Sequence, residues 1–271
     1  MRIYAIPILK NRWAYYCHST VSTTSKLTKA VNWSSKKWEQ FGKADPTTWK
    51  GKLYKRGSHF MNQVDYQEWF LKSVPAKYEL QEPLKNALVN YPKVLEGSDV
   101  QRDLESLLKD RVNYHKKYMY YSAYWVPLSC TFVIVPLIPN IPLAYNLFRL
   151  YSHYKAYHGA DSLSSLVNQG QLTYQQDEQL NALLNQHSFV SSDDLEFSQE
   201  IRQGFLEKKP NLKLLEHDLE GVLNTSDIKL IGEALDTPGL ELELNRARSQ
   251  ILKAVALESI VCKRIVCQVL K

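Results

Sequence analysis

The sequence has few residues that break helices and few that form covalent or metal cross-links. Among 271 residues there are only 10 glycines, 11 prolines and 4 cysteines. The scarcity of glycine and proline indicates few turns and long helices. The cysteines form no Cys-x-x-Cys pair, and Cys262 and Cys267 have no histidine near them. The sequence therefore predicts neither a disulfide framework nor a zinc site.

The usual catalytic and nucleotide-binding motifs are also missing. There is no Gly-x-Gly-x-x-Gly, Walker Gly-Lys-Ser/Thr, His-Glu-x-x-His or Gly-x-Ser-x-Gly segment. The seven histidines are scattered, and the acids Asp193, Asp194 and Glu196 do not have the spacing of a calcium loop. We therefore expect a protein that is not an enzyme, with no catalytic residues, no cofactor and no metal site.

Positive charge is concentrated near the start of the chain, although the net charge is only +6. The first acidic residue is Glu39, and the residues before it are rich in serine and threonine and carry scattered lysines and arginines. This composition is typical of a mitochondrial transit segment. Residues 2–8, however, have the pattern of a β-strand, which favours a folded role for this end. The mild net charge gives no reason to expect DNA binding.

A long interval without charge, from Tyr118 to Phe148, is the strongest feature of a chain in which 23% of residues are charged. The middle of this interval is aliphatic, and tyrosine and tryptophan gather at its borders. Basic residues follow the aromatic residues on both flanks, for example Lys116 and Lys117 on one side and Arg149 on the other. This order of residues is typical of a segment in contact with a lipid bilayer.

Prolines divide the uncharged interval near its centre: Pro136, Pro139 and Pro142. With Asn140 between them, they favour a turn over one continuous helix. We therefore favour a membrane hairpin with arms over about 118–135 and 141–157, which places both basic flanks on one side of the bilayer. A single membrane span and a hairpin buried in a soluble core are the alternatives.

The sequence thus divides into three regions with a mainly α fold. Residues 1–117 form a basic N-terminal region, mostly helical with a short N-terminal strand, residues 118–158 form the hydrophobic membrane hairpin, and residues 159–271 form a helical, mildly acidic C-terminal region. We expect a helical, membrane-anchored protein. Caps and apolar spacing predict individual helices at residues 99–117, 174–185, 193–205, 212–223 and 227–235 and from Pro238 onward.

Four segments together resemble a known family. They are Pro136-Leu-Ile-Pro139-Asn140-Ile-Pro142, Tyr145-Asn-Leu-Phe148-Arg149-Leu-Tyr-Ser152-His153-Tyr-Lys-Ala156-Tyr-His-Gly159, the opening Arg2-Ile-Tyr4-Ala-Ile6-Pro7-Ile, and Tyr66-Gln-Glu68-Trp69-Phe-Leu71-Lys72-Ser73-Val-Pro75. Over residues 1–165 the chain resembles the fungal mitochondrial potassium/proton exchange-related family. The resemblance implies a protein of the mitochondrial inner membrane that is linked to potassium/proton exchange.

Two hypotheses of function follow. In the first, the protein is a subunit or regulator of potassium/proton exchange, since the uncharged interval holds no carboxylate or histidine for an ion path. In the second, it is a membrane-anchored scaffold whose basic region binds a matrix partner such as the ribosome or an assembly intermediate. We expect contact with the lipid bilayer, and a homo-oligomer or a partner membrane protein, because one hairpin cannot enclose a pore.

Four residues around the turn are the candidate functional residues: Asn140, Pro142, Arg149 and His153. Asn140 would serve as a carbonyl ligand or turn cap, and Pro142 would shape the turn. Arg149 and His153 would contact lipid headgroups or a partner, and His153 is the nearby group that titrates near neutrality. Turn formation and interfacial anchoring are the simpler roles for all four.

Overall fold

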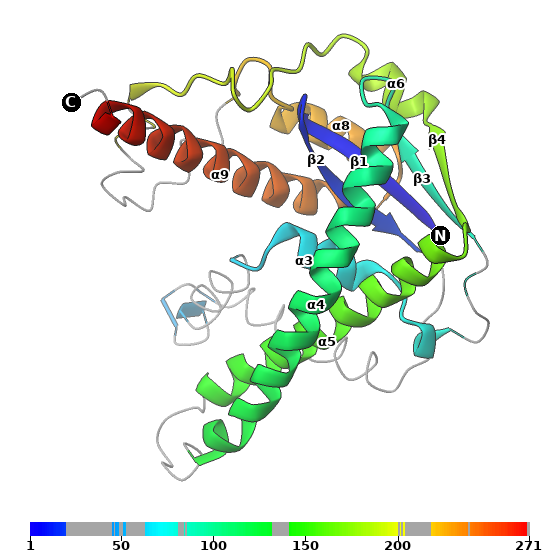
Figure 1. Ribbon diagram of the computed structural model, residues 1–271, viewed down its shortest axis with the longest axis vertical. Coiled ribbons are helices and arrows are strands. Elements are labelled where there is room, and N and C mark those ends of the chain that lie inside the picture. Colours follow the sequence, from blue (N-terminus) through cyan, green and yellow to red (C-terminus); the bar gives the residue numbers. More distant parts are fainter. Residues whose placement is uncertain are drawn as a thin grey trace. The chain divides into compact units, whose positions relative to one another are not determined.

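A computed structural model describes residues 1–19, 63–80, 86–131, 141–199, 218–237 and 239–269, together with positions 45, 47–48, 51–52, 84, 201 and 203. The chain divides into two compact units. Unit 1 comprises Met1–Arg2, Cys17–Ala87 and Arg102–Thr173, and unit 2 comprises Ile3–Tyr16, Leu88–Gln101 and Tyr174–Lys271. The α-helices and strands described below are labelled in Figure 1.

A four-stranded sheet begins with the first residues of the chain. Its strands are β1 (Arg2–Leu9), β2 (Arg12–His18), β3 (Ala87–Tyr91) and β4 (Leu172–Gln176), in the order β2-β1-β3-β4. β1 is an inner strand, and every residue from Ile3 to Leu9 is buried. A continuous buried run of this kind is typical of a strand that is covered on both faces. The prediction of a strand at residues 2–8 is confirmed.

Helices form the described core of unit 1. They are α3 (Tyr66–Ser73), the short 3-10 helix η1 (Lys77–Glu79), the part of α4 (Gly97–Cys130) from Arg102 onward, and α5 (Ile141–Asn168). Asp65 caps α3, because its carboxylate accepts the backbone N–H of Gln67 at 2.9 Å. At Gly159, α5 lies so close to α3 that a Cβ would overlap the carbonyl oxygen of Leu71.

The two long helices of unit 1, α4 and α5, form an antiparallel pair (Figure 1). Asn146 near the start of α5 donates to Ser129 near the end of α4, with 3.3 Å between Nδ2 and Oγ. His153, further along α5, contacts His115, which lies earlier in α4. The chain therefore reverses direction between residues 131 and 141, and we refer to these two helices as the α4–α5 hairpin.

Unit 2 contains α6 (Glu178–Leu184), α8 (Thr225–Ala234) and α9 (Leu240–Val269), and α8 packs against both of the others. Two hydrogen bonds of 2.9 Å join the Asn11 amide to the Oγ and the backbone N–H of Ser192. Arg248 of α9 donates through Nε to the carbonyl of Leu223 at 2.7 Å, and the N–H of Leu223 donates to Ile8 in β1 at 3.1 Å. These bonds connect the last helix to an inner strand.

The prediction of a mainly α fold is wrong, because the structure is mixed α/β with a four-stranded sheet. The predicted helix at 174–185 starts too early: β4 extends to Gln176, and α6 begins at Glu178 after its cap Asp177. Short strands obtain their burial from distant partners, which local apolar spacing does not reveal. Three predicted helices are confirmed within α4, α8 and α9. Residues 193–198 and 218–223, which belong to two other predicted helices, are turns or irregular in the structure. Residues 204–217 and most of residues 20–62 lie outside the described residues.

The prediction of a hairpin whose arms cross the bilayer is also wrong. Within the ranges given above, no helix combines the length and the apolar character that crossing a bilayer requires. The reason lies in the composition of the uncharged part of α4, which is tyrosine-rich before it becomes aliphatic. From Tyr118 to Cys130 this part rises only about 20 Å at 1.5 Å per residue, against a hydrocarbon core of roughly 30 Å.

Candidate functional site

A cluster of polar side chains joins α3, α4 and α5 of unit 1. Glu68 comes from α3, His115 from α4, and Arg149, Ser152 and His153 come from α5. Ser152 and His153 follow Arg149 by three and four positions, so that both lie on the same side of the helix as Arg149. Apart from Arg149, each member is at most 2% exposed. Burial of so many polar groups requires that they bond to one another.

Glu68 is the acceptor at the centre of this cluster. Arg149 binds it with both terminal nitrogens, with 3.0 Å from Nη1 to Oε1 and 3.3 Å from Nη2 to Oε2. Ser152 donates its hydroxyl to Oε1 at 2.5 Å. Burial by itself would raise the pKa of Glu68, but the Ser152 hydrogen bond and the Arg149 charge outweigh it and lower the pKa. Glu68 is therefore ionised and paired.

The two histidines continue the chain of hydrogen bonds. Arg149 Nη2 lies 2.9 Å from His153 Nε2, and His153 Nδ1 lies 3.0 Å from His115 Nδ1. A guanidinium only donates, which makes His153 Nε2 an acceptor and places the proton of the neutral ring on Nδ1. His115 Nδ1 then accepts, and its own proton is on Nε2. The tautomers of both rings therefore follow from the guanidinium of Arg149, which can only donate.

One ring nitrogen of His115 has a hydrogen-bonding capacity that the cluster does not satisfy. Its Nε2 is buried and has no hydrogen-bond partner among the described residues. Such an unpaired group costs about 1–3 kcal/mol. Burial lowers the pKa of His115 to about 3, and burial together with the Arg149 charge lowers the pKa of His153 to about 4. Both rings are consequently neutral at physiological pH, beside an ion pair of zero net charge.

Aromatic rings of α4 enclose the histidines. Tyr118 stacks on His153 with 5.6 Å between ring centroids and 28° between ring planes. Tyr114 contacts His115 edge-on, with 5.1 Å between centroids. Because Tyr118 is also the first residue of the uncharged part of α4, it links the buried cluster to the exposed half of the α4–α5 hairpin.

A second buried ion pair follows on α5. Lys155 donates to Glu79 of η1, and their side chains are only 11% and 1% exposed. The same Glu79 oxygen accepts the backbone N–H of Ala76 at 3.0 Å. Glu68 and Glu79 are thus each paired with a positively charged side chain of α5. Removing one partner from such a pair leaves a buried charge, which is far more costly than losing a surface ion pair.

The cluster also has to be considered as a metal site. Glu68, His115 and His153 each bring one potential ligand atom to within 4.8 Å of the others, and two histidines with one carboxylate are a ligand set that transition metals accept. Arg149, however, donates to both Glu68 and His153. A divalent ion would compete for the same lone pairs and would face the guanidinium charge in a buried position. These residues therefore do not fit a metal ion while Arg149 holds them.

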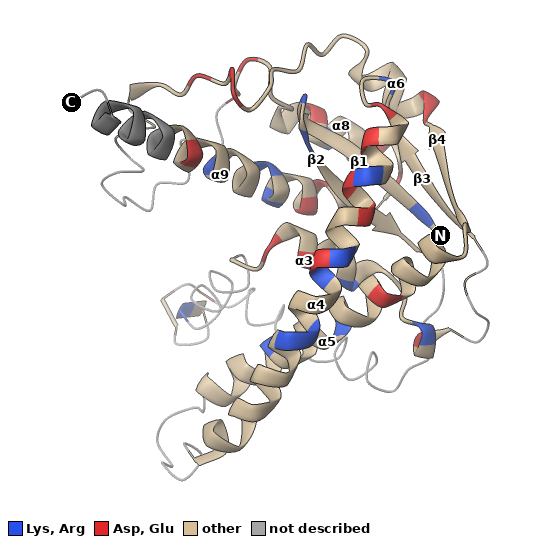
Figure 2. Cartoon of the chain, in the orientation of Figure 1, with Lys and Arg blue, Asp and Glu red and all other residues tan. Residues whose placement is uncertain are grey.

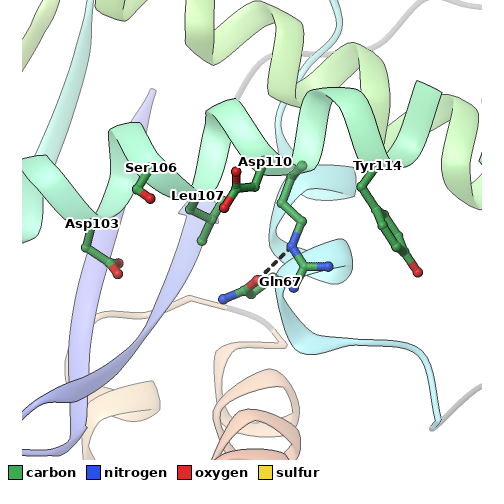
Figure 3. Close-up of a pocket in the computed structure, with 7 residues that line it drawn as sticks. Gln67, Asp103, Ser106, Leu107, Asp110 and Tyr114 are labelled. Atoms are coloured by element: carbon green, nitrogen blue, oxygen red, sulfur yellow. Dashed lines mark hydrogen bonds between the residues drawn. The ribbon is translucent and has the colours of Figure 1, made fainter. Parts of the chain in front are cut away.

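A surface pocket lies beside the cluster, where α3 meets α4 (Figure 3). It has a volume of about 380 Å³ and is lined mainly by polar side chains: Gln67, Asp103, Ser106, Leu107, Asp110, Arg111 and Tyr114. Figure 3 shows the hydrogen bond from Arg111 Nε to Gln67 Oε1, which is 2.8 Å long. Arg111 is also paired with Asp65 at 2.6 Å. The guanidinium is thus held by the protein and is not directed at an anionic ligand.

The far half of the α4–α5 hairpin has a different character from the cluster at its base. We call its exposed α4 side chains the aromatic end: Tyr118, Tyr120, Tyr121, Tyr124, Trp125 and Leu128. Tyr145 and Leu147 of α5 are exposed as well. Figure 2 shows no charged residue on this half of either helix. The hairpin therefore combines a charged, internally paired base with an uncharged, exposed end.

The sequence-predicted residues lie in different surroundings. Asn140 lies outside the described residues. Pro142 is exposed in the first turn of α5, a position that suits proline because no N–H is needed there. Arg149 and His153 lie together in the buried cluster, where they contact Glu68 and each other. Sequence analysis missed Glu68 and His115 as their partners, although Glu68 stands in one of the segments that resemble the family.

Comparisons with known proteins identify the family of this chain. The profile of the mitochondrial K+-H+ exchange-related family matches residues 2–167, and the chain belongs to that family. An uncharacterised protein of Schizosaccharomyces pombe is 28% identical over 189 residues, which cover 68% of this chain and 83% of that protein. An uncharacterised protein of Saccharomyces cerevisiae is 24% identical, with coverage of 94% and 85%. No solved structure gives a significant match.

The matched residues include every member of the buried cluster, all of α4 and all of α5 except its last residue. The resemblance seen in the sequence is thereby confirmed at the level of the family, together with its mitochondrial association.

Proposed function

We propose that this chain acts at the mitochondrial inner membrane as a subunit or regulator of K+/H+ exchange and does not itself form the ion path. The α4–α5 hairpin carries the proposal: its charges are paired at the base, and its end exposes aromatic side chains without charge. An exposed apolar surface of this kind is characteristic of proteins that contact another molecule or a membrane. The family supplies the link to exchange.

The chemistry of the buried cluster supports an accessory role. A path for K+ needs oxygen ligands, and proton exchange needs a group that titrates in that path. The oxygens of Glu68 and Glu79 are already bound by Arg149 and Lys155. The positive charge of those two side chains repels a further cation. The cluster is therefore better suited to fixing the shape of the hairpin base than to carrying ions.

Swelling of isolated mitochondria in potassium acetate tests the proposal, because this swelling needs K+ to exchange for H+. We expect mitochondria that lack the chain to swell more slowly than mitochondria that contain it. Ammonium acetate is the control, since ammonia and acetic acid cross the membrane as neutral species. Equal swelling in potassium acetate with and without the chain would show that the proposal is wrong.

Reconstitution separates the two forms of the proposal. Purified protein in potassium-loaded liposomes should give no K+ flux if the chain is a regulator, and flux only together with other components if it is a subunit. Flux from the chain alone would contradict both. The scaffold alternative stays a prediction, because most of the basic stretch on which it depends lies outside the described residues.

A further inference from the structure

We propose that the aromatic end of the α4–α5 hairpin docks on an anionic lipid bilayer and inserts into one leaflet without crossing it. This inference rests on the proposed function, since it names the surface on which the chain would act. It is carried by three observations on α4: the chemistry of the exposed side chains, the position of two lysines, and the length of the uncharged part.

The exposed side chains are those that prefer the boundary between lipid headgroups and acyl chains. Tyr124 is 79% exposed, Tyr120 is 62% exposed and Trp125 is 52% exposed. Tyrosine and tryptophan bury an apolar ring at this boundary while the polar tip stays hydrated. Leu128, one turn further, is 50% exposed and offers a purely apolar side chain to the acyl region.

Two lysines stand where the headgroups of a docked hairpin would be. Lys116 and Lys117 are exposed and directly precede the first tyrosine of the aromatic end. Lys117 Nζ lies 5.8 Å from the ring centroid of Tyr121. Beyond them, the described residues of α4 carry no charge. Each lysine at an anionic surface strengthens binding by about fivefold, which commits the proposal to anionic lipid.

The dimensions of the end fit one leaflet. The uncharged part of α4 rises about 20 Å, whereas half of the hydrocarbon core and one headgroup region together measure roughly 20 Å. The aromatic side chains also form two adjacent stripes, one from Tyr118 through Tyr121 to Trp125 and one from Tyr120 through Tyr124 to Leu128. At 100° per residue these stripes cover about 160° of the helix. A second copy of the chain, packed helix against helix, would bury a narrower stripe of α4 than this. Lipid, in contrast, covers the full width of the aromatic surface.

The test uses the full chain and vesicles of phosphatidylcholine with or without cardiolipin. Cys130 is exposed in this half of the hairpin, and Cys17 is buried. An environment-sensitive fluorophore is attached to Cys130 after the changes Cys262→Ser and Cys267→Ser. We expect its emission to shift to the blue with cardiolipin vesicles and much less with phosphatidylcholine alone. An emission that does not respond to either vesicle would overturn the proposal.

Substitutions identify the residues responsible. Tyr120→Ser/Tyr124→Ser/Trp125→Ser should weaken vesicle binding at least tenfold. Lys116→Glu/Lys117→Glu should weaken binding at least tenfold to vesicles that contain cardiolipin, but not to vesicles of phosphatidylcholine alone. The matched control is Leu230→Ser/Leu242→Ser, which changes exposed leucines of unit 2 (52% and 62% exposed) and should leave binding unchanged. Circular dichroism shows whether each variant is folded, and a variant that has lost its helices is replaced by Tyr124→Ser alone.

Other outcomes have distinct meanings. Vesicle binding that survives the triple substitution would place the contact elsewhere and overturn the inference. A vesicle-independent dimer that the triple substitution abolishes would assign the aromatic end to a second copy instead. Normal potassium-acetate swelling without the chain would refute the proposed function while the vesicle measurements stand on their own.

Discussion

The buried histidine pair predicts a marked loss of stability in mild acid. The pKa of His115 is lowered to about 3 and that of His153 to about 4 by burial, with the Arg149 charge contributing at His153. An unfolded histidine titrates near 6.5. Between these values the unfolded chain binds more protons than the native chain, so that unfolding becomes more favourable as the pH falls. The stability from this source is fully present above about pH 6.5 and is lost below it.

The magnitude follows from proton linkage. Between pH 7 and pH 5, a histidine that stays neutral when folded and titrates at about 6.5 when unfolded reduces the free energy of unfolding by about 1.9 kcal/mol. Two independent histidines reduce it by about 3.8 kcal/mol, which is a large part of the stability of an ordinary domain. The pKa of Glu68 is lowered, so this carboxylate adds a further loss only at more acidic pH.

Urea unfolding at the two pH values measures this loss. His115→Gln keeps an acceptor for His153 Nδ1 and removes one titrating ring, and it should reduce the pH effect by about half. His187→Gln is the control, because His187 lies in unit 2 and contacts Asp227 there. Ring-proton NMR follows unit 1 directly, and the signals of His115 and His153 should not titrate between pH 8 and 5. An equal pH effect in all variants, or titration of either ring near 6.5, would refute the reasoning.

Three further predictions concern the surroundings of the cluster. Arg149→Met should reduce the free energy of unfolding by about 3 kcal/mol, because it leaves the buried Glu68 carboxylate without its partner. The double variant Arg149→Met/Glu68→Leu should recover much of this loss in urea unfolding. Gly159→Ala should cost about 1–3 kcal/mol in thermal unfolding, since the added methyl group meets the backbone of α3. Burial raises the pKa of Cys17 to about 12, so iodoacetamide should alkylate Cys130 but not Cys17 in the native protein, as peptide mass spectrometry would show.

Several elements could be predicted because local pattern determines them. The run of apolar residues after Arg2 predicts β1, and the leucines of α4 at helical spacing predict its buried stripe, in which Leu104 and Leu108 are at most 2% exposed. The prolines between α4 and α5 predict the reversal of chain direction. Each of these signals lies within a few neighbouring residues.

Other elements could not be predicted because distant residues determine them. β3 and β4 are five-residue strands whose place in the sheet depends on pairing with segments far away in the sequence. Burial of α5 against α3 cannot be read from the sequence of α5 alone. The sequence predicts that Arg149 contacts lipid headgroups or a partner, but only the structure identifies that partner as Glu68.

The pairing of Glu68 with Arg149 has an evolutionary consequence. The two residues are 81 positions apart, yet neither charge is tolerable without the other in a buried setting. A lineage that loses one of them must lose both together or exchange their signs, so these two alignment columns should covary across relatives. Columns for the exposed tyrosines of α4 face no such constraint and should drift independently, as long as ring character is retained.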